Sequence, residues 1–342
     1  RNGVNTNSIE SKMGIKGSPT CVLNFENSKG IMIGPKNKGL QSMFTMMNLE
    51  RIVVGIQGLG VSETAYQNAV AYSKERKQGK SNNSVNGETD LIIKHADIRR
   101  SLMNMKSIIE GERSFAFWLS QQIDVSLNHK SKDVRDEAAN MVALLTPVIK
   151  SFFTDNGVDI TNDAIQVFGG YGYTKDQGIE QLFRDNRITP IYEGTNSVQA
   201  IDLVYRKISS NGVFENYIKT IDVELKGFEK NNELKALLNI FEKYKEILVS
   251  FTKWLRDKID LNKDDASAAC NDYLKVLGYT SLAFSWLKTI KISYEKINTN
   301  KEFYEDKINT GRYYFEKILP RAQSHYVIGT SGSKTTMVAK FN

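Results

Sequence analysis

Apolar residues recur every three or four positions along most of the chain, which is the spacing of one face of an α-helix. The longest such pattern covers residues 40–72, and further helical patterns cover residues 96–127, 132–155 and 162–168. Alternation typical of strands is confined to the start of the chain. There the stretch SPTCVLNFENSKGIMI, residues 18–33, predicts a β-hairpin because a polar turn separates two apolar runs.

A different helical pattern follows residue 209. Its apolar residues are spaced alternately by three and four and form a narrow seam on one long helix: Leu234, Leu237, Phe241, Tyr244, Leu248, Phe251 and Leu255. Residues 268–287 and 303–319 have the periodicity of helices that pack on this seam. The sequence therefore predicts a separate antiparallel helical bundle, with Trp254, Trp286 and Phe315 in its core.

The composition is that of a globular protein. Of the 342 residues, 40% are hydrophobic and 25% are charged, and no apolar run reaches the length of about 20 residues that a membrane helix needs. The two cysteines, Cys21 and Cys270, lie far apart and predict a reducing, cytoplasmic location. Three scattered histidines predict no metal site. The net charge of +7 suits either an anionic ligand or nucleic acid.

Three short stretches are candidates for chemistry. IYEGT, residues 191–195, places a carboxylate just ahead of a helical pattern, where its ordinary role is to interact with the helix dipole. GGYGYT, residues 169–174, predicts a loop that turns tightly or approaches another group closely. GIQGLG, residues 55–60, resembles part of a dinucleotide-binding motif, but it lies inside the longest helical pattern and is better explained by close helix packing.

Three motifs, in this order and spacing, resemble the acyl-CoA dehydrogenase family: QVFGGYGYT at residues 166–174, LFRD at 182–185 and IYEGT at 191–195. The resemblance covers about residues 10–208. Within the family, MGIKGSPT and QGLGVSETAYQNAVAYSKER are similar to the branch that includes 3-methylmercaptopropionyl-CoA dehydrogenases. Members of that branch carry an extra helical domain at the C-terminus.

The resemblance implies a mainly α fold in three parts. Residues 1–38 are expected to be the end of a small β-domain, and residues 39–208 the four-helix bundle of the family's C-terminal domain. Residues 209–342 are expected to be the additional antiparallel helical bundle. Because the match begins within the family's β-domain, we expect the chain to be the C-terminal part of a longer protein, without its N-terminal half.

The resemblance also implies FAD-dependent α,β-dehydrogenation of an acyl-CoA thioester, with 3-methylmercaptopropionyl-CoA as one candidate substrate. Glu193 is then the base that removes the α-proton, while the β-hydrogen leaves as hydride to flavin N5. Gly194 lets the backbone pass close to the thioester. Arg51 is expected at the acyl-CoA pocket, with Asn48 at a position where the family often has aspartate.

The expected FAD contacts come from two subunits. Arg76 and the loop of Gln166, Gly169 and Gly170 match positions that border the FAD of the neighbouring subunit. Thr195 and Ser197 match positions that border FAD in the same protomer, and capping of the next helix is their ordinary alternative.

The expected partners are an acyl-CoA substrate, an electron-transfer flavoprotein and a second copy of the chain, as a homodimer or homotetramer. Two alternatives stay open. Relatives of the alkylation-response flavoprotein keep this fold and FAD but bind DNA through a basic C-terminal domain, and salt-sensitive nucleic-acid binding would distinguish them. The chain could also serve only as a subunit-interaction piece.

Overall fold

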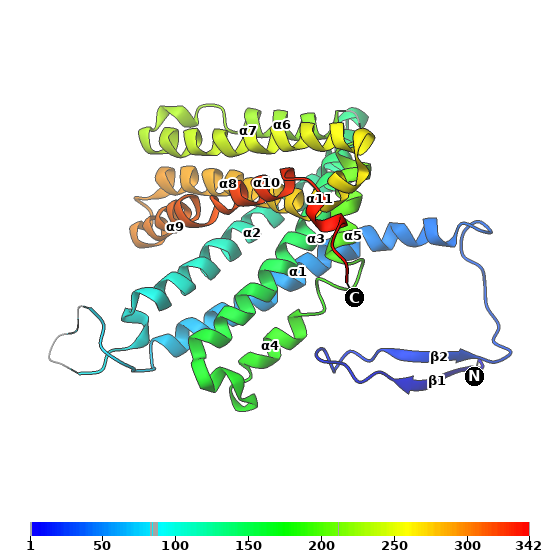
Figure 1. Ribbon diagram of the computed structural model, residues 1–342, viewed down its shortest axis with the longest axis horizontal. Helices are drawn as coiled ribbons and strands as arrows, with labels where there is room; N and C mark the ends of the chain where they lie inside the picture. The colour runs from blue at the N-terminus through cyan, green and yellow to red at the C-terminus, as the bar shows by residue number, and fades with distance from the viewer. Residues whose placement is uncertain (1, 83, 85–87, 211, 342) are drawn as a thin grey trace.

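Long helices form most of the molecule (Figure 1). The computed structural model describes residues 2–82, 84, 88–210 and 212–341. The first part contains β1 (Val4–Ile9), β2 (Cys21–Phe25), α1 (Gly39–Ser73), η1 (Ile92–Lys94), α2 (Ala96–Asn128), α3 (Lys132–Phe168), η2 (Gly169–Tyr173), η3 (Lys175–Gln177), α4 (Ile179–Asn186), α5 (Asn196–Asp202) and the π-helical turn η4 (Leu203–Lys207). The second part contains α6 (Val213–Glu224), η5 (Phe228–Lys230), α7 (Asn232–Leu261), α8 (Lys263–Lys296), α9 (Lys301–Tyr313), the π-helical turn η6 (Tyr314–Ile318), α10 (Arg321–Thr330) and α11 (Lys334–Met337).

The lower layer consists of α1, α2 and α3, which lie side by side (Figure 1). Two glycines of the GIQGLG stretch let α1 approach α3 closely. A Cβ atom on Gly55 would lie 2.5 Å from Ile149 Cγ2, and one on Gly58 would lie 3.3 Å from the Phe153 carbonyl oxygen. These distances confirm that the stretch is a helix-packing feature, because a side chain at Gly55 would collide with α3.

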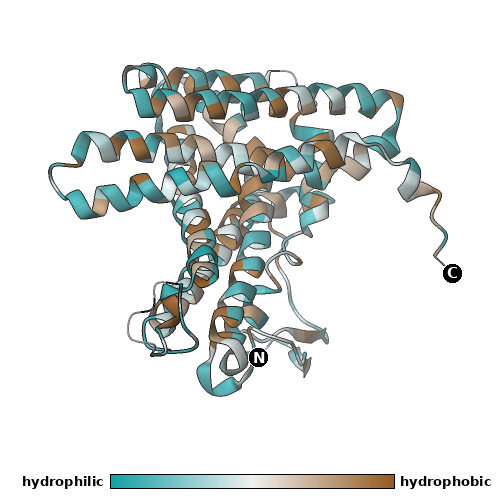
Figure 2. Ribbon diagram, turned by 60° about the vertical axis from the view of Figure 1, so that its left-hand side comes forward, coloured by the Kyte–Doolittle hydropathy of each residue, from teal (hydrophilic) through white to brown (hydrophobic). Residues whose placement is uncertain are grey.

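The upper layers run across α2 and α3, and α8 contacts both helices near their middle (Figure 1). The long helix α8 is buried along much of its length. Trp286 of α8 donates a hydrogen bond from its indole Nε1 to the Ser107 carbonyl of α2 at 3.0 Å, and Gly278 lies directly against the ring of Phe152 in α3. Hydrophobic residues gather where the layers meet (Figure 2). One buried core therefore runs through both helical parts.

The predicted seam of α7 is confirmed. Five of its seven residues are buried and the other two, Leu237 and Tyr244, are partly buried against the same core. Of the two predicted partners, residues 268–287 lie in α8, which covers the seam together with α10. Residues 303–319, in α9 and η6, pack mainly on α8 and α2 instead. The mainly α fold class is thus confirmed for the described residues, in which β1 and β2 form the one sheet. The boundary at residue 209 stays a prediction, and it falls between η4 and α6.

The predicted hairpin over residues 18–33 is wrong in its pairing. Strand β2 pairs antiparallel with β1, from Val4 opposite Phe25 to Ile9 opposite Cys21. Ile31 and Ile33 lie outside any strand and are 93% and 90% exposed. The sequence pattern favoured the apolar residues 31–33 as the partner of β2. The true partner, β1, is mostly polar and exposed, so its pairing depends on backbone hydrogen bonds and not on burial.

The hairpin contacts the helical body at α4. The Ile15 amide donates to Asp185 Oδ1 at 2.6 Å, and Arg184 donates from Nη1 to the Met13 carbonyl at 2.8 Å. The acceptor Asp185 and the donor Arg184 both belong to the LFRD motif. This motif therefore joins the β-structure to the helices.

The predicted break in the helix between residues 155 and 162 is also wrong, because α3 is continuous from Lys132 to Phe168. Two of the polar residues that interrupted the pattern, Asn156 and Thr161, are buried and hydrogen-bonded. Thr161 donates back to the Gly157 carbonyl at 2.8 Å, and Asn156 donates to Glu112 Oε1 at 2.8 Å.

None of the described helices is long and apolar enough to cross a membrane.

Glu112 is a fully buried carboxyl group between α2 and α3. Its Oε1 accepts the bond from Asn156, whereas Oε2 has no hydrogen-bond partner among the described residues. Burial raises the pKa of the Glu112 carboxyl well above its usual range, and the Asn156 bond only partly opposes this shift. The folded protein therefore favours the protonated form of this group more strongly than the unfolded chain does.

We expect Glu112→Gln to stabilise the fold at neutral pH. The unfolded chain releases the Glu112 proton above about pH 4.5, while the folded chain keeps it. Stability therefore falls by about 1.4 kcal/mol for each pH unit above that value, until the folded-state pKa is reached. Urea unfolding from pH 4 to pH 8 should show a smaller decline for the glutamine variant than for the wild type.

The exposed Glu75→Gln variant controls for the loss of one charge. It should keep the wild-type decline with pH. Equal pH dependence of Glu112→Gln and the wild type would contradict a protonated Glu112 in the folded state.

Candidate active site

Glu193 lies in a tight turn between α4 and α5. Its φ of 56° is left-handed, and Gly194 follows with a φ of 84°. Non-glycine residues seldom adopt this conformation unless the surroundings impose it. A Cβ on Gly194 would also lie 2.8 Å from Gln199 Nε2, so glycine is needed here for space as well. Glu193 precedes the N-cap residue Thr195 by two positions and lies outside the first turn of α5.

The main support of this turn is Lys150 of α3, which is fully buried. Its Nζ donates to the Gly194 carbonyl at 2.7 Å and to Asn196 Oδ1 at 2.8 Å. Asn196 in turn donates from Nδ2 to Asp155 Oδ1 at 2.6 Å. Burial lowers the pKa of the Lys150 ammonium to about 8; the nearby Arg51 charge lowers it too, whereas Asp155 and Glu193 oppose the shift.

Two further contacts hold the turn. Gln199 of α5 donates from Nε2 to the Glu193 carbonyl at 3.2 Å. The Tyr192 hydroxyl donates to Gln57 Oε1 of α1. The backbone around Glu193 is therefore fixed from α1, α3 and α5 together, while its own side chain is half-buried.

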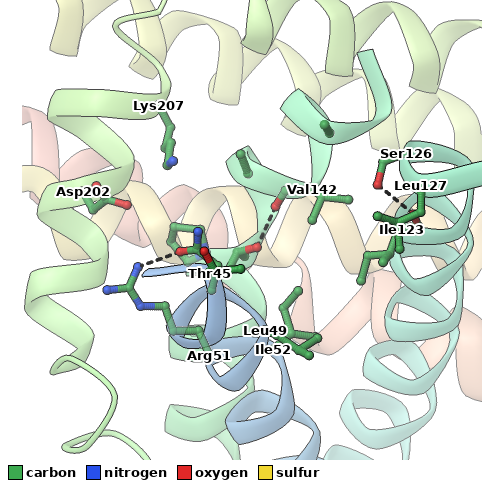
Figure 3. A pocket seen from close by; sticks show the side chains of 15 residues that line it. Thr45, Leu49, Arg51, Ile52, Ile123, Ser126, Leu127, Val142, Asp202 and Lys207 are labelled. Atoms are coloured by element: carbon green, nitrogen blue, oxygen red, sulfur yellow. Dashed lines mark hydrogen bonds between the residues drawn. The ribbon is translucent and has the colours of Figure 1, made fainter. Parts of the chain in front are cut away.

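A cavity of about 450 Å³ lies between α1, the end of α2, α3 and η4 (Figure 3). Its walls are mostly apolar and include Leu49, Ile52, Ile123, Leu127, Val142 and Pro147. Arg51 and Asn48 line it together, and Arg51 donates from Nη1 to Asn48 Oδ1 at 3.5 Å. Asp202 and Lys207 also line the cavity and, with Arg51 and Asn48, make this end of it polar. We call this the α1–η4 cavity.

A second cavity, of about 540 Å³, brings together four residues that were expected to contact FAD. Arg76, Gln166, Gly169 and Gly170 all line it, although Arg76 is far from the others in sequence. The Arg76 guanidinium carbon lies 5.8 Å from the centre of the Tyr171 ring. A Cβ on either glycine would meet nothing within 4 Å, so the loop backbone is open to a ligand, and Gly169 itself has a φ of 62°. The predicted GGYGYT loop forms the 3-10 turn η2.

Thr195 and Ser197 are exposed at the start of α5. Thr195 caps the helix, because its Oγ1 accepts from the Val198 amide at 3.4 Å. Ser197 does not cap; its Oγ accepts from Asn271 Nδ2 of α8 at 3.4 Å. Their contact with FAD stays a prediction.

The sequence motifs did not identify four residues at these sites: Lys150, Gln57, Asp202 and Lys207. Lys150 gave a signal, because it is the one charged residue in the apolar run TPVIKSFF. Such a lysine must either reach solvent or find buried acceptors. Lys207 follows Arg206 at a helix end and looked like an ordinary surface residue.

No described group of His, Cys, Asp and Glu is arranged to hold a metal ion.

A family model described as acyl-CoA dehydrogenase, C-terminal domain, matches residues 37–208, which is just over half of the chain. The chain belongs to the acyl-CoA dehydrogenase family. A second model, described as acetyl-CoA dehydrogenase C-terminal like, matches residues 217–340. The first match ends at residue 208 and the second begins at residue 217, and the predicted boundary at residue 209 lies between them.

Relatives in the acyl-CoA dehydrogenase family include enzymes with different named substrates. The chain is 38% identical over 212 residues to 3-methylmercaptopropionyl-CoA dehydrogenase of Ruegeria pomeroyi, covering 62% of this chain and 36% of the relative. It is 30% identical over 335 residues to a butyryl-CoA dehydrogenase of Syntrophomonas wolfei, covering 93% and 55%. The chain therefore spans from about a third to just over half of these relatives' lengths.

The fold agrees with that of a solved acyl-CoA dehydrogenase. The crystal structure of an acyl-CoA dehydrogenase complexed with FAD, from Bacillus anthracis, matches with a TM-score of 0.74 and 20% sequence identity. The match covers 99% of this chain and 58% of the other. At this identity the likeness concerns the fold, and it extends through both helical parts.

We expect Lys150→Met to loosen the turn that carries Glu193. Methionine has a similar length but cannot donate to the Gly194 carbonyl or to Asn196. Loss of these bonds should make amide hydrogen exchange in residues 191–196 about tenfold faster. Mass spectrometry of the exchanged protein measures this directly. The exposed Lys130→Met variant should leave the segment unchanged, and equal exchange in both variants would contradict the role of Lys150.

Proposed function

We propose that the protein carries out α,β-dehydrogenation of an acyl-CoA thioester with FAD, and that Glu193 is the base. The observation that carries this proposal is the turn of Glu193, which Lys150, Gln199 and Tyr192 hold in place. Glu193 and the cavity residue Arg51 both lie within electrostatic reach of the buried Lys150 ammonium. A general base must first lie at a fixed distance from the proton that it removes; only then does its pKa affect the rate. The contacts to α1, α3 and α5 hold the backbone of Glu193 in one place.

The residues of the second cavity fit a flavin dinucleotide. Arg76 supplies a guanidinium that suits phosphate, and the backbone at Gly169 and Gly170 is open to close approach. FAD, when bound, supplies the acceptor for the β-hydrogen as hydride. This cavity and the turn of Glu193 lie at different places on the helices, which supports a site completed by a second copy of the chain.

The chemistry of the chain's own residues is proton removal. The bond between the α-carbon and its hydrogen breaks, and the Glu193 carboxylate takes the proton while the electron pair forms the new double bond. In this proposal the Glu193 amide polarises the thioester carbonyl, on which negative charge develops as the proton leaves. Gly194 leaves room for the Gln199 side chain, which packs against the turn at this position.

The names of the relatives support the substrate class. They act on acyl-CoA thioesters, including 3-methylmercaptopropionyl-CoA and butyryl-CoA. The higher identity to the first makes 3-methylmercaptopropionyl-CoA one candidate substrate. An electron-transfer flavoprotein is the proposed electron acceptor, and the active form is proposed to be a homodimer or homotetramer.

We expect Glu193→Gln to abolish flavin reduction by acyl-CoA in the FAD-loaded protein. The amide keeps the size of the side chain but cannot accept the α-proton, and loss of a general base lowers the rate by about 10²–10⁴-fold. Anaerobic mixing with a panel of acyl-CoA thioesters, followed by bleaching of the flavin absorbance, measures this rate. Binding of FAD and acyl-CoA should be nearly unchanged.

Glu302→Gln is the matched control, because Glu302 lies in the first turn of α9, where its charge faces the helix dipole. That variant should lose at most about 1 kcal/mol of stability and keep full activity. Bleaching at the wild-type rate in Glu193→Gln would remove Glu193 from the mechanism. Salt-sensitive DNA binding without reduction by any acyl-CoA would favour the DNA-binding alternative instead.

We expect Arg76→Ala to lower FAD retention and oligomerisation together. Its guanidinium faces the second cavity, where it would contact the phosphates of the FAD held by a neighbouring subunit. Flavin absorbance and light scattering after gel filtration measure both properties. The exposed Arg99→Ala variant is the control. An intact Arg76→Ala oligomer with normal flavin content would show that the assignment is wrong.

A further inference from the structure

Two of the polar residues of the α1–η4 cavity, Asp202 and Lys207, come from one helical segment that consists of α5 and η4 (Figure 3). Asp202 forms an ion pair with Arg206 of the same segment, and its charge also attracts the Lys207 ammonium. No hydrogen bond between described residues joins the side chain of Asp202 or Lys207 to α1, α2 or α3. The contacts that fix η4 therefore also fix where these two side chains lie at the cavity.

The carbonyl groups at the end of this segment need hydrogen-bond donors, because a helix leaves its last carbonyls without a partner. Ser209 and Ser210 supply two donors locally. Ser209 Oγ donates to the Val204 carbonyl at 2.9 Å, and Ser210 Oγ donates to the Arg206 carbonyl at 2.8 Å. Ile208 is fully buried, and its carbonyl takes its donor from a distant helix.

That donor is Arg256 of α7. Its Nε donates to the Ile208 carbonyl at 2.8 Å, across 48 residues of sequence. The same guanidinium bonds both carboxylate oxygens of Glu215 in α6, at 2.5 and 3.3 Å, and its Cζ lies 5.9 Å from the centre of the Phe214 ring. The Arg256 side chain is 34% exposed, so the ion pair contributes little stability, whereas the carbonyl of a buried residue depends on its donor.

A second contact holds η4 from α8. The Tyr205 hydroxyl donates to the Lys263 carbonyl at 3.1 Å and lies 2.8 Å from Ser267 Oγ. Lys263 and Ser267 belong to the first two turns of α8. The C-terminal helices therefore contact this segment at Tyr205 and at Ile208, on either side of Lys207.

We propose that Arg256 and Tyr205 are positioning residues, through which the C-terminal helices hold η4 where Asp202 and Lys207 give the α1–η4 cavity its ligand-binding shape. Neither of the two side chains lines the cavity, so each acts through η4. This inference rests on the proposed function, in which acyl-CoA is the ligand of the cavity. It gives the C-terminal helical part a role in substrate affinity.

The first test measures the affinity for CoA, which binds without reacting, by isothermal titration calorimetry of the FAD-loaded protein. Arg256→Met keeps apolar contact with Phe214 but cannot donate to the Ile208 carbonyl. We expect it to weaken CoA binding by about threefold to tenfold, because loss of one hydrogen bond lets η4 leave its bound position by about that factor. Tyr205→Phe removes the other contact and should weaken binding in the same direction.

Two control variants separate the bond to Ile208 from the loss of charge. Glu215→Gln removes the ion pair but leaves the donor of Arg256 in place, so its CoA affinity should stay within about twofold of the wild type. Arg312→Met removes an arginine of α9 that bonds Glu233 and Tyr294 away from η4, and it should bind CoA as the wild type does.

The limiting rate of flavin reduction by butyryl-CoA distinguishes positioning of the cavity from damage to the reaction site. This rate should stay within about twofold of the wild type in Arg256→Met, because Lys150, Gln199 and Tyr192 hold the turn of Glu193 independently of α7. The KM for butyryl-CoA should rise with the loss of CoA affinity. A fall in the limiting rate with unchanged affinity would overturn the inference.

Amide hydrogen exchange without ligand tests the hold on η4 directly. Residues 203–210 should exchange about tenfold faster in Arg256→Met and at the wild-type rate in Glu215→Gln. Equal exchange in both variants, or faster exchange in Arg256→Met without loss of CoA affinity, would overturn the inference and leave the proposed function intact. A wild-type protein that binds CoA but reduces no flavin with any acyl-CoA would overturn the proposed function alone. If the wild-type protein fails to bind CoA, both proposals fail.

Discussion

A single buried ammonium group connects the helical core with the turn that carries Glu193. Lys150 has no access to solvent, and its bonds to the Gly194 carbonyl and Asn196 replace the water it loses. Because α3 runs through the middle of the molecule, these bonds attach the turn to a rigid part of the fold. A left-handed glutamate persists only under such constraint, and here α1, α3 and α5 all contribute to it.

The close approach of α1 and α3 determines where the two cavities lie. Gly55 and Gly58 let the helices touch in their middle, and the α1–η4 cavity lies beside the N-terminal half of α1. The second cavity lies by the other end of the same helices, where Arg76 follows α1 and Gln166 lies in the last turn of α3. One packed helix pair thus holds residues of both sites in fixed relation.

The C-terminal helices also contact the elements that form the candidate sites. Trp286 reaches the backbone of α2, and Asn271 of α8 contacts Ser197 at the start of α5. The turn η4, which leads from α5 towards α6, also supplies Lys207 to the α1–η4 cavity. The chain around residue 209 therefore links the two helical parts physically, through a shared core as well as through the backbone.

The sequence by itself determined the helices whose apolar faces repeat regularly, such as α1, α2 and the seam of α7, because their periodicity reflects burial on one side. Its motifs also identified Glu193, Arg51, Arg76 and the Gly169 loop as candidates. It failed for β1, whose pairing leaves no apolar pattern, and for the polar middle of α3, whose Asn156 and Thr161 are satisfied by distant or local hydrogen bonds. Only the tertiary structure could reveal the role of Lys150. A lysine in the sequence carries the same charge everywhere, but its surroundings decide whether it is solvated or bonded to a buried carbonyl.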